Sequence, residues 1–438
     1  MEAHTSEEIV PYAVNIGGNH FASYFAAVVL TCILNDCFGG NVGFSLVDNV
    51  KRWLARQEET GPERNAMVMS GGGARAAYQV GVIKYISEDF PDALFSVFTG
   101  VSAGAINTAG LVNFEGSFPD AASRLVSSWR ELSTDRVVRP ESTISMFRRL
   151  WFSGKKDEGE YDTTSNRRRA LLDASPLREY MMQKLGIPES GVLTAVQKNI
   201  DAGRLHACAV ITTNYNTGQS VSWVQGADVS AWQRPNRKAI QTEINIDHIM
   251  ASAALPLLFP AVRIGDSWYG DGGVRLTMPL STAMNLGADR LLVISTRYDR
   301  SRAEADEKAV QGYPPASQIL GVLMNAIFLD VLDQDAMITQ QINELIKELP
   351  KHKRLGMRPI RLLTLRPSQD IGKLAGSFEM ELSGALGWAT SGQRSSENKS
   401  PDWLSMLMFE HDYVNRLMEI GYSDARQQRE HIEKFLAD

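Results

Sequence analysis

Short runs of apolar residues alternate along this chain with segments in which apolar residues recur every three or four positions. The short runs predict strands at residues 66–69, 94–99, 205–213, 290–296 and 361–365. The run at 205–213 is almost continuously apolar, which is typical of a strand buried on both faces. Residues 220–224 are expected to be its hairpin partner, and two shorter strands are expected at 262–264 and 268–269.

The periodic segments predict helices at residues 74–88, 121–132, 176–185, 247–254, 279–286 and 318–349, with two more inside 401–436. We expect Asp247 to cap the fourth of these helices and Gly421 to separate the last two. The helix at 318–349 carries an apolar stripe that we expect to pack against the core, with contact to a membrane surface as the alternative.

One strand-to-helix junction carries the pattern of a nucleophilic serine. Ser102 lies between Gly100 and Gly104, after the strand at 94–99 and before a run of small residues that predicts a helix. A serine at such a sharp turn takes a strained backbone conformation that pushes its hydroxyl clear of the sheet. Side chains at positions 100 and 104 would clash where strand and helix nearly touch, so glycine is required at both.

A second glycine-rich loop follows the first strand. Gly71, Gly72 and Gly73 come directly before the helix at 74–88, and such a loop presents backbone N–H groups that bind an anion. That anion is either a phosphate or the oxyanion of acyl transfer. Gly71, Gly73 and Ala76 also fit the dinucleotide-binding pattern, but the next strand ends at the serine turn without the acidic residue that such a site needs.

Composition argues against several classes of function. The chain has 438 residues, of which 44% are hydrophobic and 22% charged, and its formal net charge of -6 argues against binding nucleic acid through bulk charge. Its three cysteines imply no disulfide framework. Histidines and cysteines do not cluster at the spacing of metal ligands, so we expect neither a metal ion nor a cofactor.

The first 64 residues look separate from the rest of the chain, because a polar linker closes them at residues 57–65. An apolar run at 21–34 is 14 residues long, whereas a spanning helix needs roughly 20, and no Lys or Arg precedes it. We therefore expect a packed helix in a cytoplasmic protein, with a membrane anchor as the alternative.

A serine nucleophile needs a base, and the spacing of the residues leaves two candidates. His248 lies at the start of a predicted helix, where a structural role is the commoner one. Asp271 lies in a glycine-rich turn after the strand at 268–269, where it would point into a cleft, although Asp-Gly-Gly is also an ordinary tight turn. Spacing alone does not choose between them.

Four motifs taken together resemble the patatin-like phospholipases. They are Gly71-Gly72-Gly73-Ala74-Arg75, Gly100-Val101-Ser102-Ala103-Gly104, Ala251-Ser252-Ala253-Ala254-Leu255-Pro256 with Phe259-Pro260, and Asp271-Gly272-Gly273. They occur in the order seen in that family, over roughly residues 66–297, and the tail resembles the bacterial branch. The resemblance implies a three-layer α/β/α sandwich with a mainly parallel central sheet, a helical cover region and a C-terminal helical extension.

The resemblance also implies roles for single residues. Ser102 would be the nucleophile and Asp271 the base of a catalytic dyad that uses no histidine. Gly71, Gly72 and Gly73 would form the oxyanion loop.

Arg75 would fix that loop. Two positions depart from the family pattern: Ser70 stands where Asp is common, and Ala76 stands where Gly is common. The geometry of the oxyanion site is therefore expected to differ slightly, with activity retained.

The function that the resemblance implies is that of a serine hydrolase, which cleaves acyl esters of phospholipids or lysophospholipids through an acyl-serine intermediate. The alternatives are a Ser-His-Asp esterase that uses His248 and a nucleotide-binding module at residues 71–73. We expect an N-terminal segment at 1–64, a catalytic domain at 65–300 and a helical extension at 301–438 packed on the core.

The expected partners are lipid and the surface of a membrane, not nucleic acid, and the oligomeric state stays open. Arg167, Arg168 and Arg169 end a charged loop. We expect that loop to be solvated, with contact to anionic lipid head groups as the alternative.

Overall fold

The structure is a computed structural model. It describes residues 63–140, 172–256, 258–306, 313, 316–350, 353–354, 357–378 and 405–437. Apart from residues 353–354, all of these belong to one compact unit made of Pro62–Pro350 and Met357–Asp438. The apolar run at 21–34 and the arginines at 167–169 lie outside the described residues, so the predictions made for them stay predictions.

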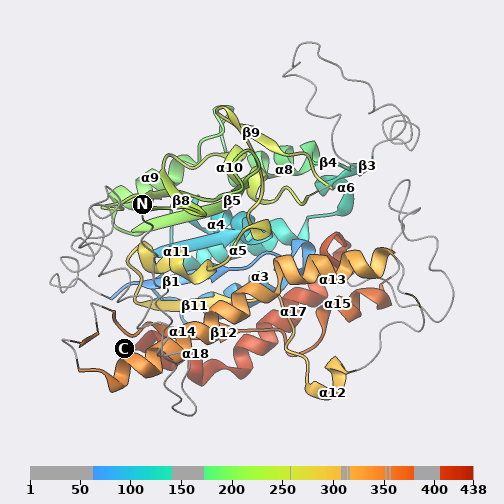
Figure 1. The fold of residues 1–438 in the computed structure, drawn as a ribbon. Helices are drawn as coiled ribbons and strands as arrows, with labels where there is room; N and C mark the ends of the chain where they lie inside the picture. The colour runs from blue at the N-terminus through green and yellow to red at the C-terminus, as the bar shows by residue number, and fades with distance from the viewer. Residues whose placement is uncertain are drawn as a thin grey trace, which may run out of the picture. The chain divides into compact units, whose positions relative to one another are not determined.

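Within the described residues, ten strands form one sheet at the centre of this unit (Figure 1). Its main path is β12 (Arg361–Leu365), β11 (Arg290–Ile294), β1 (Asn65–Met69), β2 (Val97–Val101), β5 (Ala207–Asn214), β6 (Ser220–Gly226), β8 (Arg237–Gln241) and β7 (Gln233–Arg234). The strands from β12 to β5 are parallel, so their carboxyl ends share one edge. β6 pairs antiparallel with β5, which confirms the predicted hairpin.

A hairpin of β9 (Val262–Ile264) and β10 (Ser267–Asp271) reaches this carboxyl edge. β10 pairs antiparallel with the last residues of β5, so that Asp271 lies opposite Thr212. β2 ends one residue before Ser102, and β2 and β5 are neighbours in the sheet. The strand order therefore brings Ser102 and Asp271 to the same edge from distant parts of the sequence.

Successive side chains of the parallel strands enter two separate cores. On β1, Met67 and Met69 lie in one core, whereas Ala66 and Val68 lie in the other, and all four are buried. The first core includes α3 (Ala77–Asp89), α4 (Ala103–Val112), α5 (Phe118–Arg130) and α17 (His411–Gln427), and the second includes α11 (Pro279–Asn285) and α14 (Asp330–Glu348). Helices thus cover both faces of the sheet, and the expected three-layer α/β/α fold is confirmed.

The remaining elements complete this arrangement. They are β3 (Arg139–Pro140), β4 (Leu172–Asp173), α6 (Thr134–Val137), α8 (Ser175–Leu185), α9 (Thr194–Asp201), α10 (Ile246–Ser252), α12 (Arg302–Ala305), α13 (Ala316–Phe328), α15 (Ile371–Leu374), α18 (Arg429–Ala437), η1 (Gly73–Ala76), η3 (Gly272–Val274) and η5 (Ala375–Ser377). None of the helices in the described ranges combines the length and the apolar character needed to cross a bilayer.

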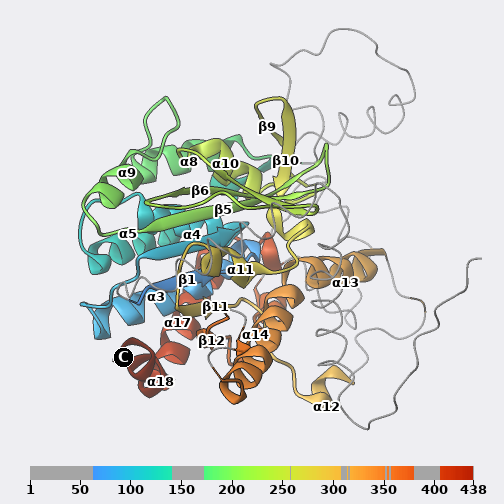
Figure 2. The ribbon, with the colours of Figure 1, turned by 60° about the vertical axis from the view of Figure 1, so that its left-hand side comes forward.

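The helix predicted at 318–349 is two helices, and Figure 2 shows α13 and α14 running in different directions. Arg297 forms an ion pair with Asp330 at 2.8 Å, which anchors the first turn of α14. Phe328, at the end of α13, packs against Gly273, where an added Cβ would lie 2.4 Å from the Phe328 ring. These two tertiary contacts lie on either side of the break between the two helices. The apolar residues continue through the break at helical spacing, so the sequence pattern does not indicate it.

The prediction that Gly421 separates the last two helices is wrong, because the break falls at Gln428. Gly421 lies inside α17, where a Cβ would be 2.1 Å from the carbonyl oxygen of Tyr78 on α3. Gly81 on α3 is placed in the same way, since its Cβ would be 2.0 Å from the carbonyl oxygen of Met418. The two glycines let α3 and α17 approach closely.

Other boundaries also differ from the prediction, among them the cap of α10 and the start of β2. Asn245, and not Asp247, caps α10, because its side chain accepts hydrogen bonds from two backbone N–H groups of the first turn at 3.0 and 3.2 Å. Asp247 instead pairs with Arg178. β2 starts at Val97, and Leu94 ahead of it is exposed.

Candidate active site

Ser102 occupies the sharp turn between β2 and α4. Its φ of 55° lies in the left-handed region, which residues other than glycine rarely adopt, so the backbone is strained there. A Cβ at Gly100 would lie 2.3 Å from the Gly104 carbonyl oxygen, and one at Gly104 would lie 2.4 Å from the Met69 carbonyl oxygen on β1. The close approach of strand and helix thus requires both glycines, as the sequence pattern predicts.

Asp271 ends β10 with its carboxyl group fully buried beside Ser102. Its Oδ1 accepts a hydrogen bond from the Gly273 N–H at 2.9 Å. Its Oδ2 is buried and has no hydrogen-bond partner among the described residues, although the Ser102 hydroxyl is near enough to affect the pKa of the carboxyl group. Burial raises the pKa of Asp271 from 3.8 to about 7, although hydrogen bonding to the Ser102 hydroxyl and to the Gly273 N–H lowers that pKa in part.

Ser252 and the residues that follow it contact the backbone of both Ser102 and Asp271, a role that the amino-acid sequence alone does not indicate. The Ser102 N–H donates to Ser252 Oγ at 3.0 Å, and the buried Ser252 hydroxyl donates to the Ile211 carbonyl oxygen on β5 at 2.6 Å. Two residues further on, the Ala254 carbonyl oxygen accepts from the Asp271 N–H at 3.0 Å. One short segment at the end of α10 therefore holds the backbone of both residues.

The glycine loop lies directly against Ser102. A Cβ at Gly71 would be 3.0 Å from the Ser102 Cβ. Gly72 and Gly73 have φ values of 139° and 58°, which favour glycine. In the described ranges of the chain, the backbone N–H groups of these three glycines donate to no other protein group. Thr296 Oγ1 donates to the Gly71 carbonyl oxygen at 2.6 Å and so fixes the orientation of the loop.

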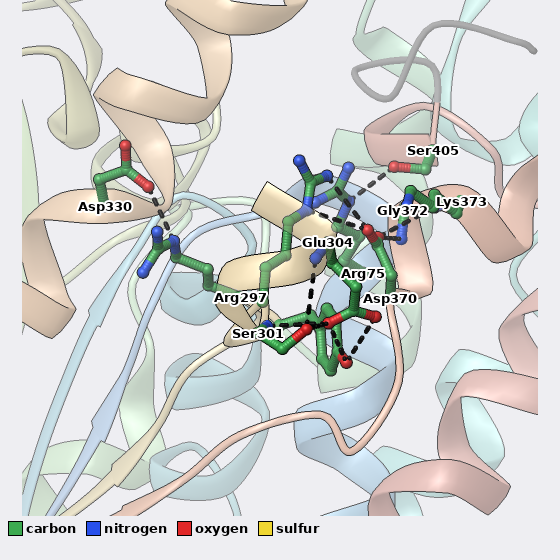
Figure 3. Close-up of polar contacts among 11 residues, drawn as sticks. Arg75, Arg297, Ser301, Glu304, Asp330, Asp370, Gly372, Lys373 and Ser405 are labelled. Atoms are coloured by element: carbon green, nitrogen blue, oxygen red, sulfur yellow. Dashed lines mark hydrogen bonds and ion pairs between the residues drawn. The ribbon is translucent and has the colours of Figure 1, made fainter. Parts of the chain in front are cut away.

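The C-terminal part of the chain supports this loop. Arg75 is buried, and its Nε donates to Ser405 Oγ at 2.6 Å (Figure 3). Gly73 lies against Met406, whose carbonyl oxygen would be 2.0 Å from a Cβ at that glycine. Ser405 is 330 positions away from Arg75 in the sequence, so no local pattern could indicate the contact.

The two departures from the family pattern are buried and hydrogen-bonded. Ser70 Oγ accepts from the Thr296 N–H at 3.2 Å, and the Ser70 carbonyl oxygen accepts from Gln79 Nε2 at 2.9 Å. The Ala76 carbonyl oxygen accepts from Asn107 Nδ2 at 3.2 Å. Both positions thereby connect the glycine loop to neighbouring elements of the fold.

His248, the other candidate base, has structural contacts. Its Nδ1 accepts from the Asn245 N–H at 3.0 Å within the capping box of α10. Its ring lies over Trp223, with 4.4 Å between the ring centroids. Burial lowers the pKa of His248 to about 4. A neutral, engaged imidazole of low basicity is poorly suited to accept the proton of a serine.

Two cavities flank the serine turn. The first is bounded by the glycine loop, the serine turn, the turn after Asp271 and α13. Its lining includes Gly71, Gly100, Gly273, Ile327 and Phe328. The second has mostly apolar walls that include Ala103, Ile106, Trp129, Leu177 and Phe409. Both offer apolar surroundings close to Ser102. In the part of the chain that the structure describes, no three His, Cys, Asp or Glu side chains gather as they would around a metal ion.

Comparison with known proteins gives one match to a family. Residues 67–284 match the sequence model of the family described as patatin-like phospholipase. No curated protein matches the chain. The matched range contains Ser102, Asp271 and the glycine loop.

Several solved structures are distantly similar. They include VipD from Legionella pneumophila (14% identity, TM-score 0.35, 85% of this chain and 67% of that chain), human GIVD cytosolic phospholipase A2 (11%, 0.42, 89% and 64%) and the type III effector protein ExoU (13%, 0.34, 86% and 54%). The chain therefore spans about two thirds or less of the length of these proteins. Such distant similarity supports no inference about function.

Proposed function

Since the chain carries a domain of the patatin-like phospholipase family at residues 67–284, we propose that it hydrolyses acyl esters of phospholipids or lysophospholipids with Ser102 as nucleophile and Asp271 as base. The observation that carries this proposal is the buried Asp271 carboxyl beside the strained Ser102 turn. A pKa of about 7 lets that carboxyl both accept and return a proton near neutral pH.

In the first half of the reaction, Asp271 takes the hydroxyl proton of Ser102 as Ser102 Oγ forms a bond to the carbonyl carbon of the ester. The carbonyl oxygen becomes an oxyanion, which the N–H groups of Gly71, Gly72 and Gly73 stabilise. The bond to the leaving alcohol then breaks, and the protonated Asp271 returns its proton to that alcohol. The acyl group is left on Ser102.

In the second half, Asp271 takes a proton from water while the water oxygen attacks the acyl carbon. The oxyanion forms again at the same N–H groups. The bond to Ser102 Oγ breaks, Ser102 regains a proton from Asp271, and a fatty acid leaves. A carboxylate suffices as the base because an alcohol is a better leaving group than an amine, so that proton delivery is less demanding.

The dyad is tested with a short-chain soluble ester and a fluorophosphonate probe that labels activated serines. We expect Ser102→Ala to lose both hydrolysis and labelling, and Asp271→Asn to lower the rate of each at least about a thousandfold, because the base is gone. Both variants should keep the wild-type circular dichroism spectrum.

Asp266→Asn is the matched control, since it changes an exposed carboxyl in the same hairpin. Wild-type rates in Asp271→Asn would reject Asp271 as the base. Labelling at a serine other than Ser102 would reject the dyad altogether. No feature of the described site favours a nucleotide-binding function, since β2 ends at the serine turn without an acidic residue.

A further inference from the structure

α13 is an uncharged helix beside the candidate active site. None of its thirteen residues, Ala316–Phe328, is charged, whereas 22% of the whole chain is. Its main contacts are with α14 and with η3, the turn that follows Asp271. One face of this helix is turned toward the candidate site, and the other is turned toward the surface of the unit.

The inner face of α13 forms part of the site. Met324 and Phe328 are buried, and the Phe328 ring lies against Gly273. Ile327 and Phe328 also line the cavity that Gly71 borders. The helix is thus a wall between the catalytic turns and the surface of the unit.

The outer face of α13 is apolar and exposed. Ile319, Val322, Leu323 and Ala326 follow the spacing of a single helical face, and all four are exposed. Val322 is 60% exposed and Leu323 is 54% exposed. Apolar side chains that form one exposed stripe indicate a surface that binds another protein or a membrane.

Ion pairs hold the start of α14, which follows the end of α13 after a single residue. Arg297 binds both Asp330 and Asp333 of α14, at 2.8 and 2.9 Å, and Figure 3 shows Arg297 reaching Asp330. Arg297 directly follows Thr296, which holds the glycine loop. The same short segment therefore supports the glycine loop and the helix that follows α13.

From this geometry we infer that the outer face of α13 inserts into the surface of a phospholipid bilayer. The inference rests on the proposed function, because a lipid hydrolase must take its ester from a bilayer. The same helix lines the cavity bordered by Gly71 with Ile327 and faces outward with Val322, so an acyl chain leaving the bilayer along α13 reaches the side of the serine turn without crossing a charged side chain of that helix. Since α13 has no charge, binding does not require anionic lipid.

The test measures co-sedimentation of the full chain with phosphatidylcholine vesicles, and separately the hydrolysis of a short soluble ester. In the double variant Val322→Asp/Leu323→Asp, we expect vesicle binding to fall at least about tenfold, because two apolar side chains no longer leave water. Hydrolysis of the soluble ester should stay at the wild-type rate. Val322→Ser/Leu323→Ser, which adds no charge, should show the same loss in smaller measure.

Leu94→Asp is the matched control. Leu94 is 80% exposed, and it precedes β2, at the end of the sheet opposite the carboxyl edge. We expect it to bind vesicles as the wild type does, and we expect wild-type binding to change little between low and high salt.

Vesicle binding that is equal in wild type and the α13 double variant would overturn the inference, and so would an equal loss in Leu94→Asp. A change in the molar mass of the protein in the double variant without vesicles, measured by sedimentation, would show that the α13 face meets a second copy instead. Failure of the proposed function has a different signature: the wild type would bind vesicles through α13 but would hydrolyse no ester.

Discussion

At the scale of a single residue, the proposed role of the Asp271 carboxyl group predicts how activity depends on pH. As the proposed base it would act only when ionised, and burial raises its pKa to about 7. We expect kcat/KM for a soluble ester to rise about tenfold per pH unit below pH 7 and to level off above it. A profile already flat at about pH 5 would contradict a base with this pKa.

The same pKa predicts how stability depends on pH. Between about pH 4 and pH 7, the unfolded chain has released the Asp271 proton whereas the folded protein still holds it, so stability falls as pH rises through this window. Asp271→Asn removes this loss. In urea unfolding, the variant should therefore gain stability relative to wild type between about pH 4 and about pH 8, by as much as about 4 kcal/mol. Asp266→Asn, at an exposed site, should show no such gain.

Ser252 is a positioning residue for the strained serine turn. Its hydroxyl accepts from the Ser102 N–H and donates to the Ile211 carbonyl oxygen, so Ser252→Ala leaves the buried N–H of the proposed nucleophile unpaired. We expect kcat for a soluble ester to fall about tenfold or more with KM nearly unchanged, because the contact orients Ser102 and does not bind substrate.

The control for that prediction is Ser222→Ala, a buried serine on β6 whose hydroxyl makes a 3.4 Å contact with Thr282. It should leave kcat at the wild-type value. Equal effects of the two substitutions on kcat would mean that Ser252 acts through general stability alone.

At the scale of elements, the crossing of α3 and α17 depends on Gly81 and Gly421. A Cβ at either glycine would meet a backbone carbonyl oxygen of the other helix at 2.0–2.1 Å. We expect Gly421→Ala to lower the free energy of unfolding by about 1–3 kcal/mol through overpacking. Helix propensity alone predicts the opposite sign, since alanine favours a helix more than glycine does.

Chemical denaturation decides between the two signs. Gly376→Ala is the matched control, because a Cβ at Gly376 would meet no atom within 4 Å. It should change stability by less than about 0.5 kcal/mol. A stabilising effect of Gly421→Ala would show that the helices are free to move apart.

At the scale of the whole molecule, the C-terminal residues complete the sheet as well as the site. β12 is the strand next to β11, α17 packs on α3, and Ser405 holds Arg75 beside the glycine loop. A chain that ends after Pro350 keeps Ser102 and Asp271 but loses all three supports.

We therefore expect the shortened chain to aggregate, or to remain in solution without hydrolysing a soluble ester, as measured by size-exclusion chromatography and by the ester assay. The full chain is the reference in both measurements. A monodisperse, active product would show that residues 1–350 are sufficient for the fold and the reaction.

The sequence by itself determined the features that depend on neighbouring residues. The Ser102 turn follows from Gly100 and Gly104, because sterics within a few positions demand them. The buried strands could be predicted from short apolar runs, because both faces of such a strand are removed from water and apolar residues therefore occupy successive positions. The family resemblance covers the same residues, and the proposed pairing of Ser102 with Asp271 comes from that resemblance.

Only the tertiary structure decided the features that join distant positions. The sequence placed Gly421 between two helices, whereas close packing on Tyr78 keeps it inside one. Ser252 lies 150 positions from Ser102 in the sequence, and Ser405 lies 330 positions from Arg75. No local sequence pattern could therefore predict either contact. Burial also set the basicity of the two candidate bases, because removal from water favours the neutral form of both and so raises the pKa of Asp271 and lowers that of His248.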